Sequence, residues 1–181
     1  MYPYFKIDEK LLELSKRAEE KAQPQFRRIE DIQRYNQQKM LAAFNSAGVS
    51  ESHFAASTGY GYGDRGRDVL DQVYAYALGA EDALVRYNFV SGTHTLTVAL
   101  FGMLRPGDKM LCVTGTPYDT IQGVIGLPGR EEPGSLKEFG IGYEQVDLLP
   151  DGTPDYAAME KRITPEYRMV YIQRSRGYSL R

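Results

Sequence analysis

The stretch Val90-Ser91-Gly92-Thr93-His94-Thr95 decides how the fold of this 181-residue sequence is interpreted, because a strand pattern ends there and a helix pattern begins at once. The first amides of a helix have no internal acceptors and lie at the positive end of its dipole. Gly92 lets the backbone approach a ligand closely, and Ser91 and Thr93 add hydroxyl donors. The stretch therefore predicts a phosphate-binding turn at the carboxyl end of a sheet strand. The alternative is that Ser91 or Thr93 only caps the helix.

Strand and helix patterns alternate along the chain around this stretch. We expect strands over residues 83–90, 109–114, 143–148 and 169–172, and helices over residues 68–78, 93–104, 118–126 and 155–163. Such alternation predicts an α/β fold with a mostly parallel sheet. Residues 127–139 are rich in Gly, Pro and Glu and are expected to form a loop, of which the acidic stretch at residues 130–134 is expected to be solvated.

The amino-terminal residues have a different pattern. Apolar residues recur at helical spacing over residues 8–47, and Pro24 is expected to separate two amphipathic helices there. We expect residues 1–50 to form a helical arm, which is either a solvated surface or a grip on another subunit. Residues 51–181 are then the first part of a larger domain. The sequence stops directly after a predicted buried strand, so we expect that domain to be incomplete.

Composition excludes several classes of protein. The 22 Lys and Arg residues nearly balance 24 Asp and Glu residues, so no basic excess suggests a nucleic-acid partner. Cys112 is the single cysteine, which excludes a disulfide framework and a cysteine-rich metal site. No secretory leader and no apolar run of membrane length is recognisable. We therefore expect a cytoplasmic protein with no membrane partner and no metal.

Several linked segments carry a resemblance to a known family. They are the turn at residues 90–95, Leu104-Arg105-Pro106-Gly107-Asp108, the aromatic turn around Tyr118, and the upstream block Gly59-Tyr60-Gly61-Tyr62-Gly63-Asp64-Arg65-Gly66-Arg67-Asp68. In this order they resemble the large domain of fold-type-I pyridoxal-phosphate enzymes, which is the aspartate-aminotransferase-like fold. The upstream block narrows the resemblance to the methionine gamma-lyase-like family, often called aluminium-resistance proteins, of which this sequence resembles the amino-terminal part.

The resemblance implies a cofactor, pyridoxal 5'-phosphate, and residues that hold it. Gly92 and Thr93 would bind the phosphate through their backbone amides, with help from Ser91. Tyr118 would stack on the pyridine ring, although such an aromatic can also simply pack on the core. His94 would either contact the ligand or make a structural hydrogen bond, and the sequence assigns His53 no role.

The resemblance also implies that a neighbouring subunit contributes to the site. Tyr60, Tyr62 and Arg65 are the candidates that would reach a neighbour's phosphate, and their spacing leaves open which of them do so. An arginine suits this place because its planar guanidinium matches a phosphate. The expected assembly is a homo-oligomer, a dimer or a tetramer.

The resemblance implies an enzymatic activity, and part of its catalytic site is expected to lie outside this chain. The expected function is carbon–sulfur lysis of a sulfur-containing amino acid, with the Schiff-base lysine and the carboxylate for the ring nitrogen lying beyond Arg181. The chain alone is therefore expected to be inactive. The alternatives are another fold-type-I enzyme, such as an aminotransferase or a decarboxylase, or a non-catalytic module that binds a phosphorylated ligand or another subunit. A dinucleotide site at Gly61, Gly63 and Gly66 is disfavoured, because no buried strand is predicted before these glycines.

Overall fold

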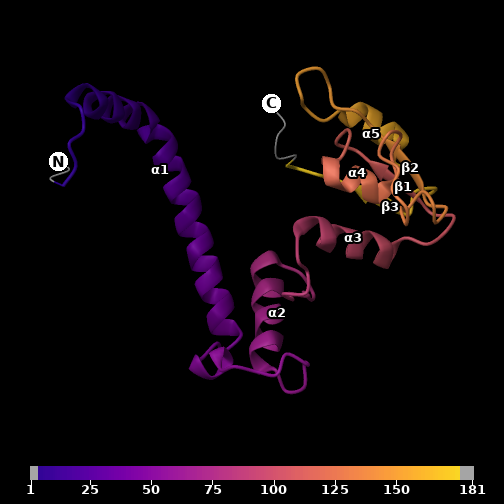
Figure 1. Cartoon of the computed structure of the whole chain (residues 1–181), viewed down its shortest axis with the longest axis horizontal. Helices are drawn as coiled ribbons and strands as arrows, with labels where there is room; N and C mark the ends of the chain where they lie inside the picture. The colour runs from indigo at the N-terminus through magenta and orange to yellow at the C-terminus, as the bar shows by residue number, and fades with distance from the viewer. Residues whose placement is uncertain (1–3, 176–181) are drawn as a thin grey trace. The chain divides into compact units, whose positions relative to one another are not determined.

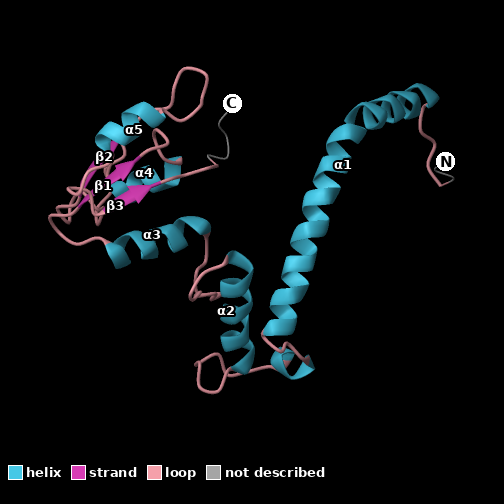
Figure 2. Cartoon of the chain, turned by 180° about the vertical axis from the view of Figure 1, so that it is seen from behind, coloured by secondary structure: helices cyan, strands magenta, loops and turns pink. Residues whose placement is uncertain are grey.

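The computed structural model describes residues 4–175, which form two compact units, and the boundary along the chain lies between Arg86 and Tyr87 (Figures 1 and 2). The first unit contains the helices α1 (Glu9–Ser46), η1 (Glu51–Phe54, a 3-10 helix) and α2 (Arg65–Leu78). The second unit contains α3 (Gly92–Met103), β1 (Lys109–Cys112), α4 (Asp119–Ile125), β2 (Gly142–Gln145), α5 (Tyr156–Arg162) and β3 (Met169–Tyr171). No helix within residues 4–175 combines the length and the apolar character that crossing a membrane requires.

Helix α1 corrects the prediction of two amino-terminal helices. It runs without interruption from Glu9 to Ser46, with Pro24 inside it. Figures 1 and 2 show that α1 bends between its amino-terminal part and its longer carboxy-terminal part. A proline removes one helical hydrogen bond and displaces the preceding turn, so that a kink is a common outcome. Pro24 is exposed, and water can therefore satisfy the carbonyl that loses its donor.

Helix α2 begins earlier than residue 68, where the sequence predicted it. Asp64 caps the helix by accepting a hydrogen bond from the amide of Arg67 at 3.2 Å. Position 66 must be a glycine, because a Cβ on Gly66 would lie 2.2 Å from the carbonyl oxygen of His53. This glycine therefore serves the packing of α2 against η1. A helix and not a strand precedes it, which removes the structural context of a dinucleotide site.

The strand predicted over residues 83–90 is wrong. No sheet hydrogen bonds involve this segment, and Leu84 and Val90 are exposed. Its first part, up to Arg86, is instead fixed by Asp71 of α2, whose carboxylate accepts from the amide of Val85 and from Arg86, each at 2.7 Å. A strand requires a neighbouring strand, and none is paired with this segment among residues 4–175.

A three-stranded parallel sheet organises the second unit and confirms the predicted α/β architecture. The strand order is β2-β1-β3, with β1 parallel to both neighbours. Successive side chains of β1 point to opposite faces of the sheet. Met110 packs with residues of α3 and α4, whereas Leu111 packs with Val113, Val146 and Tyr167, against which α5 lies. The helices predicted over residues 93–104, 118–126 and 155–163 are confirmed to within one residue at each end.

A charged network joins β2 to α5 and to the segment before β3. Glu144 pairs with Arg162 and accepts a hydrogen bond from the hydroxyl of Tyr167 at 2.8 Å. This bond raises the pKa of Tyr167, because it favours the protonated phenol. Lys109 extends the network to Glu166 at 2.9 Å.

Replacing Glu144 with glutamine is expected to destabilise the protein by about 1 kcal/mol, because Arg162 and Tyr167 lose a charged acceptor in a partly exposed place. Urea unfolding measures this effect. Glu160→Gln is the matched control, since Glu160 lies on α5 and is exposed, and its side chain makes no ion pair or hydrogen bond with another residue in the range 4–175. Equal unfolding midpoints for the two variants would contradict the expectation.

Candidate functional site

The amino terminus of α3 leaves two backbone donors open. Ser91 is the N-cap, and its hydroxyl accepts a hydrogen bond from the amide of His94 at 3.1 Å. The amide of Thr95 donates to the carbonyl of Ser91 at 3.0 Å. The amides of Gly92 and Thr93 have no protein acceptor among residues 4–175. Ser91 therefore caps the helix, and its capping leaves two adjacent N–H groups available for a ligand.

An open cavity of about 580 Å³ lies beside these donors. A Cβ built on Gly92 would meet no atom within 4 Å, so the backbone there faces open space. The structure brings Gly92, Thr93 and Tyr118 together at this cavity, as the sequence predicted for a shared site. The lining residues are Gly92, Thr93, Leu96, Tyr118, Ile121, Gln173 and Ser175.

The hydroxyl groups of Thr93 and Thr120 connect α3 to α4. Their oxygens are 2.6 Å apart, so one hydroxyl donates to the other. Thr93 therefore has its side chain engaged in the protein while its amide remains open. The bond fixes the distance between the first turns of two helices that both border the cavity. The sequence analysis did not single out Thr120, because nothing local distinguishes it from an ordinary residue of a first helical turn.

The turn that carries Tyr118 is held from two sides. The side chain of Gln173 accepts a hydrogen bond from the amide of Tyr118 at 2.9 Å. The side-chain amide of Gln122 donates to the carbonyl of Pro117 at 2.8 Å. Tyr118 is half-buried and forms the N-cap of α4. Its backbone is thus tied both to α4 and to the segment that follows β3.

A second glutamine supports the same turn from β2. Gln145 donates from Nε2 to the hydroxyl of Thr116 at 3.2 Å and accepts from the hydroxyl of Tyr143 at 2.8 Å. Burial raises the pKa of Tyr143, so that this phenol stays protonated and remains a donor at ordinary pH. Gln145 and Gln173 were both missed by the sequence analysis. Their position in the sequence could have indicated a role in the site, because each stands at or just beyond the carboxyl end of a parallel strand, where ligands of α/β sheets bind.

The two histidines have structural hydrogen bonds. His94 accepts from the amide of Val90 at 3.4 Å through Nδ1, and its ring contacts the edge of Phe89. This contact agrees with the structural alternative for His94. His53 accepts from the amide of Ser50 at 3.0 Å and so closes the start of η1.

The candidates for a contribution to a neighbouring subunit lie in the first unit. Tyr60 and Tyr62 are 82% and 92% exposed, which leaves their rings uncovered by this chain. Arg65 is exposed, and its guanidinium makes no ion pair or hydrogen bond within residues 4–175. Arg67, by contrast, pairs with Asp64 at 3.4 Å. Of these two arginines in the first turn of α2, Arg65 is therefore the one whose guanidinium is open to an external anion.

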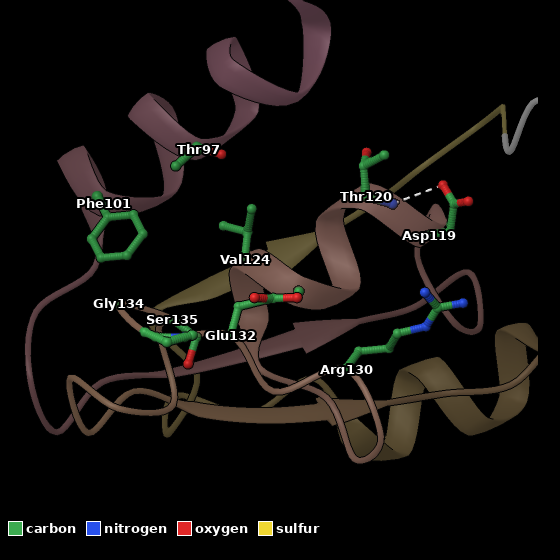
Figure 3. A pocket seen from close by; sticks show the side chains of 11 residues that line it. Thr97, Phe101, Asp119, Thr120, Val124, Arg130, Glu132, Gly134 and Ser135 are labelled. Carbon is green, nitrogen blue, oxygen red and sulfur yellow. Dashed lines mark hydrogen bonds between the residues drawn. The ribbon is translucent and has the colours of Figure 1, made fainter.

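A second cavity, of about 370 Å³, lies between α3, α4 and the loop at residues 127–139 (Figure 3). Figure 3 shows Thr97 and Phe101 projecting from α3, with Glu132 of the loop lying close to α4. Packing there is tight at one point, because a Cβ on Gly123 would lie 3.0 Å from the Cγ of Glu132. The loop is thus folded against the helices. No group of three or more His, Cys, Asp or Glu residues within residues 4–175 is placed to hold a metal ion.

Comparison with known proteins shows the family to which this chain belongs. The family model described as methionine gamma-lyase matches residues 11–181. The chain therefore belongs to the methionine gamma-lyase family.

Three individual relatives are similar to this chain in sequence, and two of them have solved structures. A carbon–sulfur lyase involved in aluminium resistance from Clostridium novyi NT is 51% identical and has a similar structure, with a TM-score of 0.87 over 93% of this chain and 41% of that one. A candidate cystathionine beta-lyase involved in aluminium resistance from Listeria innocua is 47% identical, with a TM-score of 0.86 over 93% of this chain and 41% of that one. The protein YnbB of Bacillus subtilis is 48% identical over 86% of this chain and 37% of its own length. The chain thus spans about two fifths of the length of these relatives.

Proposed function

We propose that this chain is the amino-terminal part of a pyridoxal-phosphate-dependent carbon–sulfur lyase that acts on a sulfur-containing amino acid. Family membership and the name of the Clostridium novyi relative support the class of reaction. The observation that carries the cofactor proposal is the open pair of amides at Gly92 and Thr93, which share one cavity with Tyr118.

The residues of this cavity fit the two ends of pyridoxal 5'-phosphate. Two adjacent N–H groups at a helix amino terminus suit a phosphate dianion, because they combine hydrogen bonds with the positive end of the dipole. The ring of Tyr118 offers a flat apolar surface for a heteroaromatic ring. A cavity of about 580 Å³ is also in the size range of ordinary cofactor sites. We therefore extend the proposal to the fold, as the large domain of a fold-type-I enzyme.

The chain's own residues bind and orient the cofactor in this proposal. When bound, pyridoxal phosphate supplies an electron sink for the bonds next to the substrate's α-carbon. Gly92 and Thr93 hold the phosphate through their amides, and Ser91 fixes the turn that presents them. Tyr118 covers one face of the ring and excludes water from it. The lysine and the carboxylate that complete the site are proposed to follow residue 181, so that residues 1–181 alone have no turnover.

We also propose a cytoplasmic homo-oligomer in which Tyr60, Tyr62 and Arg65 serve a neighbouring subunit. Their exposure supports this arrangement, and so does the row of exposed apolar side chains on α1, which includes Leu11, Leu14, Ile29, Ile32, Leu41 and Phe44. In solution these side chains are costly to leave uncovered. A second copy of the chain would cover them.

Replacing Arg65 with alanine in the full-length protein is expected to weaken pyridoxal phosphate binding about tenfold or more, because a charge-assisted contact to the phosphate is lost. Equilibrium dialysis measures the dissociation constant. Arg168→Ala is the control, since Arg168 is also exposed and stands before the amino end of β3, away from the carboxyl ends of the strands. Equal affinities in both variants would remove Arg65 from the site.

Product analysis of the full-length protein tests the activity. The protein is incubated with pyridoxal phosphate and with cysteine, methionine or cystathionine, and three products are quantified: ammonia, keto acid, and the sulfur product, which is hydrogen sulfide from cysteine and a thiol from the other two. A lyase releases all three in equal amounts from at least one of these substrates. An aminotransferase yields keto acid without free ammonia and needs an amino acceptor, whereas a decarboxylase yields carbon dioxide and an amine. Absence of any product would favour the non-catalytic alternative and contradict the proposal.

A further inference from the structure

Gln173 links the ends of two strands to the turn that carries Tyr118. Gln173 follows β3, and its Oε1 accepts hydrogen bonds from the amide of Tyr118 at 2.9 Å and from the hydroxyl of Tyr171 at 3.5 Å. Its own backbone amide donates to the hydroxyl of Thr114, just beyond β1, at 3.0 Å. Two of these contacts join residues that are 55 and 59 positions apart in the sequence. Gln173 is therefore a tertiary connection and not part of a local turn.

The backbone amide of Tyr118 fixes the orientation of the Gln173 side chain. A backbone N–H can only donate, so the oxygen of the side-chain amide must face it, and the hydroxyl of Tyr171 then donates to the same oxygen. Nε2 has no protein acceptor among residues 4–175. A glutamate at this position would thus keep each protein contact of the side chain and exchange only Nε2 for a second oxygen.

The bond from Tyr118 to Gln173 supports only one end of the cavity, the end that would bind the cofactor ring. Tyr118 is the N-cap of α4, a helix of seven residues, and Gln173 is the acceptor for the amide of the residue that carries the ring. The phosphate-binding amides belong to α3, which Gln173 does not bond. Loss of the Gln173 acceptor would therefore remove one of the two bonds that hold the Tyr118 turn, at the ring-binding end of the cavity, and leave the phosphate-binding end in place.

We propose that Gln173 is a positioning residue that holds Tyr118 against the cofactor ring. This inference rests on the proposed function, because it assumes that the cavity binds pyridoxal phosphate. It predicts a selective defect: affinity that depends on the ring falls, whereas affinity that depends on the phosphate alone does not.

The test compares Gln173→Leu and Gln173→Glu with the unchanged full-length protein. Dissociation constants are measured by equilibrium dialysis for pyridoxal phosphate and, by competition, for inorganic phosphate. Gln173→Leu is expected to weaken pyridoxal phosphate binding about tenfold, the effect of one lost hydrogen bond to a part-buried group together with a displaced ring. Inorganic phosphate should bind as before. Gln173→Glu should restore pyridoxal phosphate binding to within about threefold of the unchanged protein, since the acceptor is kept.

Three outcomes would overturn the inference. The first is an unchanged affinity for pyridoxal phosphate in Gln173→Leu. The second is an equal loss of affinity for both ligands, which would indicate general disruption of the site. The third is a failure of Gln173→Glu to restore binding, because Nε2 and not the acceptor would then carry the effect. If the unchanged protein does not bind pyridoxal phosphate, the proposed function itself fails, which is a separate result.

Discussion

Replacing Gly92 with aspartate in the full-length protein is expected to raise the dissociation constant for pyridoxal phosphate about a hundredfold or more. The new carboxylate would stand beside the open amides and repel the phosphate, and a repulsion of about 3 kcal/mol at this distance is enough for that loss. The fold should tolerate the change. A Cβ at Gly92 meets no atom within 4 Å, and an acidic residue in the first turn of a helix is favourable. The measurement is equilibrium dialysis with the cofactor.

Gly102→Asp is the matched control for this variant. Gly102 lies in the last turns of the same helix, is exposed and also has no atom within 4 Å of a built Cβ. The charge change is the same, but it occurs far along the helix from the open amides. We expect less than about a twofold change in affinity for the control. If Gly92→Asp bound the cofactor as well as Gly102→Asp does, the phosphate would not lie at the start of α3.

The second large effect concerns stability and arises at the end of α4. Replacing Gly126 with alanine is expected to destabilise the protein by about 3 kcal/mol, as the sum of two costs. Gly126 has a φ of +85°, which alanine adopts with strain. Its Cβ would also lie 2.7 Å from Oγ of Ser135, which is buried, and 2.9 Å from Cβ of Lys137. Denaturant unfolding measures the loss.

Gly129→Ala separates the two costs. Gly129 has a similar φ of +76°, but a Cβ there would meet no atom within 4 Å. Only the backbone strain remains, so we expect a loss of about 1 kcal/mol. Equal losses in the two variants would mean that the loop at residues 127–139 does not pack against the end of α4 as the structure describes.

Local patterns in the sequence were sufficient to predict the elements of the second unit. The turn from Val90 to Thr95 predicted the start of α3, and alternation predicted a parallel sheet, because both depend on residues close together in the chain. The prediction of a strand over residues 83–90 was wrong. Its apolar and β-branched residues suit a strand, but no neighbouring strand is paired with it among the described residues. The prediction that Pro24 separates two helices was also wrong, because an exposed helix can accommodate a proline as a bend.

Residues of the candidate site could be predicted where their own position along the chain identifies them. Contacts between residues that are distant in the sequence could not be predicted. Gly92, Thr93 and Tyr118 each stand just after a strand or at a helix start, and the structure brings them to one cavity. The bond between Thr93 and Thr120 and the bond between Tyr118 and Gln173 join different elements. Such contacts depend on the register of the sheet, which a single sequence does not specify.

Cofactor binding by the full-length protein is the measurement that tests the central claim most directly. The protein is dialysed against pyridoxal phosphate, with and without inorganic phosphate as competitor, and the Gly92→Asp variant is treated in the same way. The account predicts saturable binding of a single cofactor per chain, competition by phosphate and loss of binding in the variant. Absence of saturable binding, or binding that Gly92→Asp leaves unchanged, would contradict it.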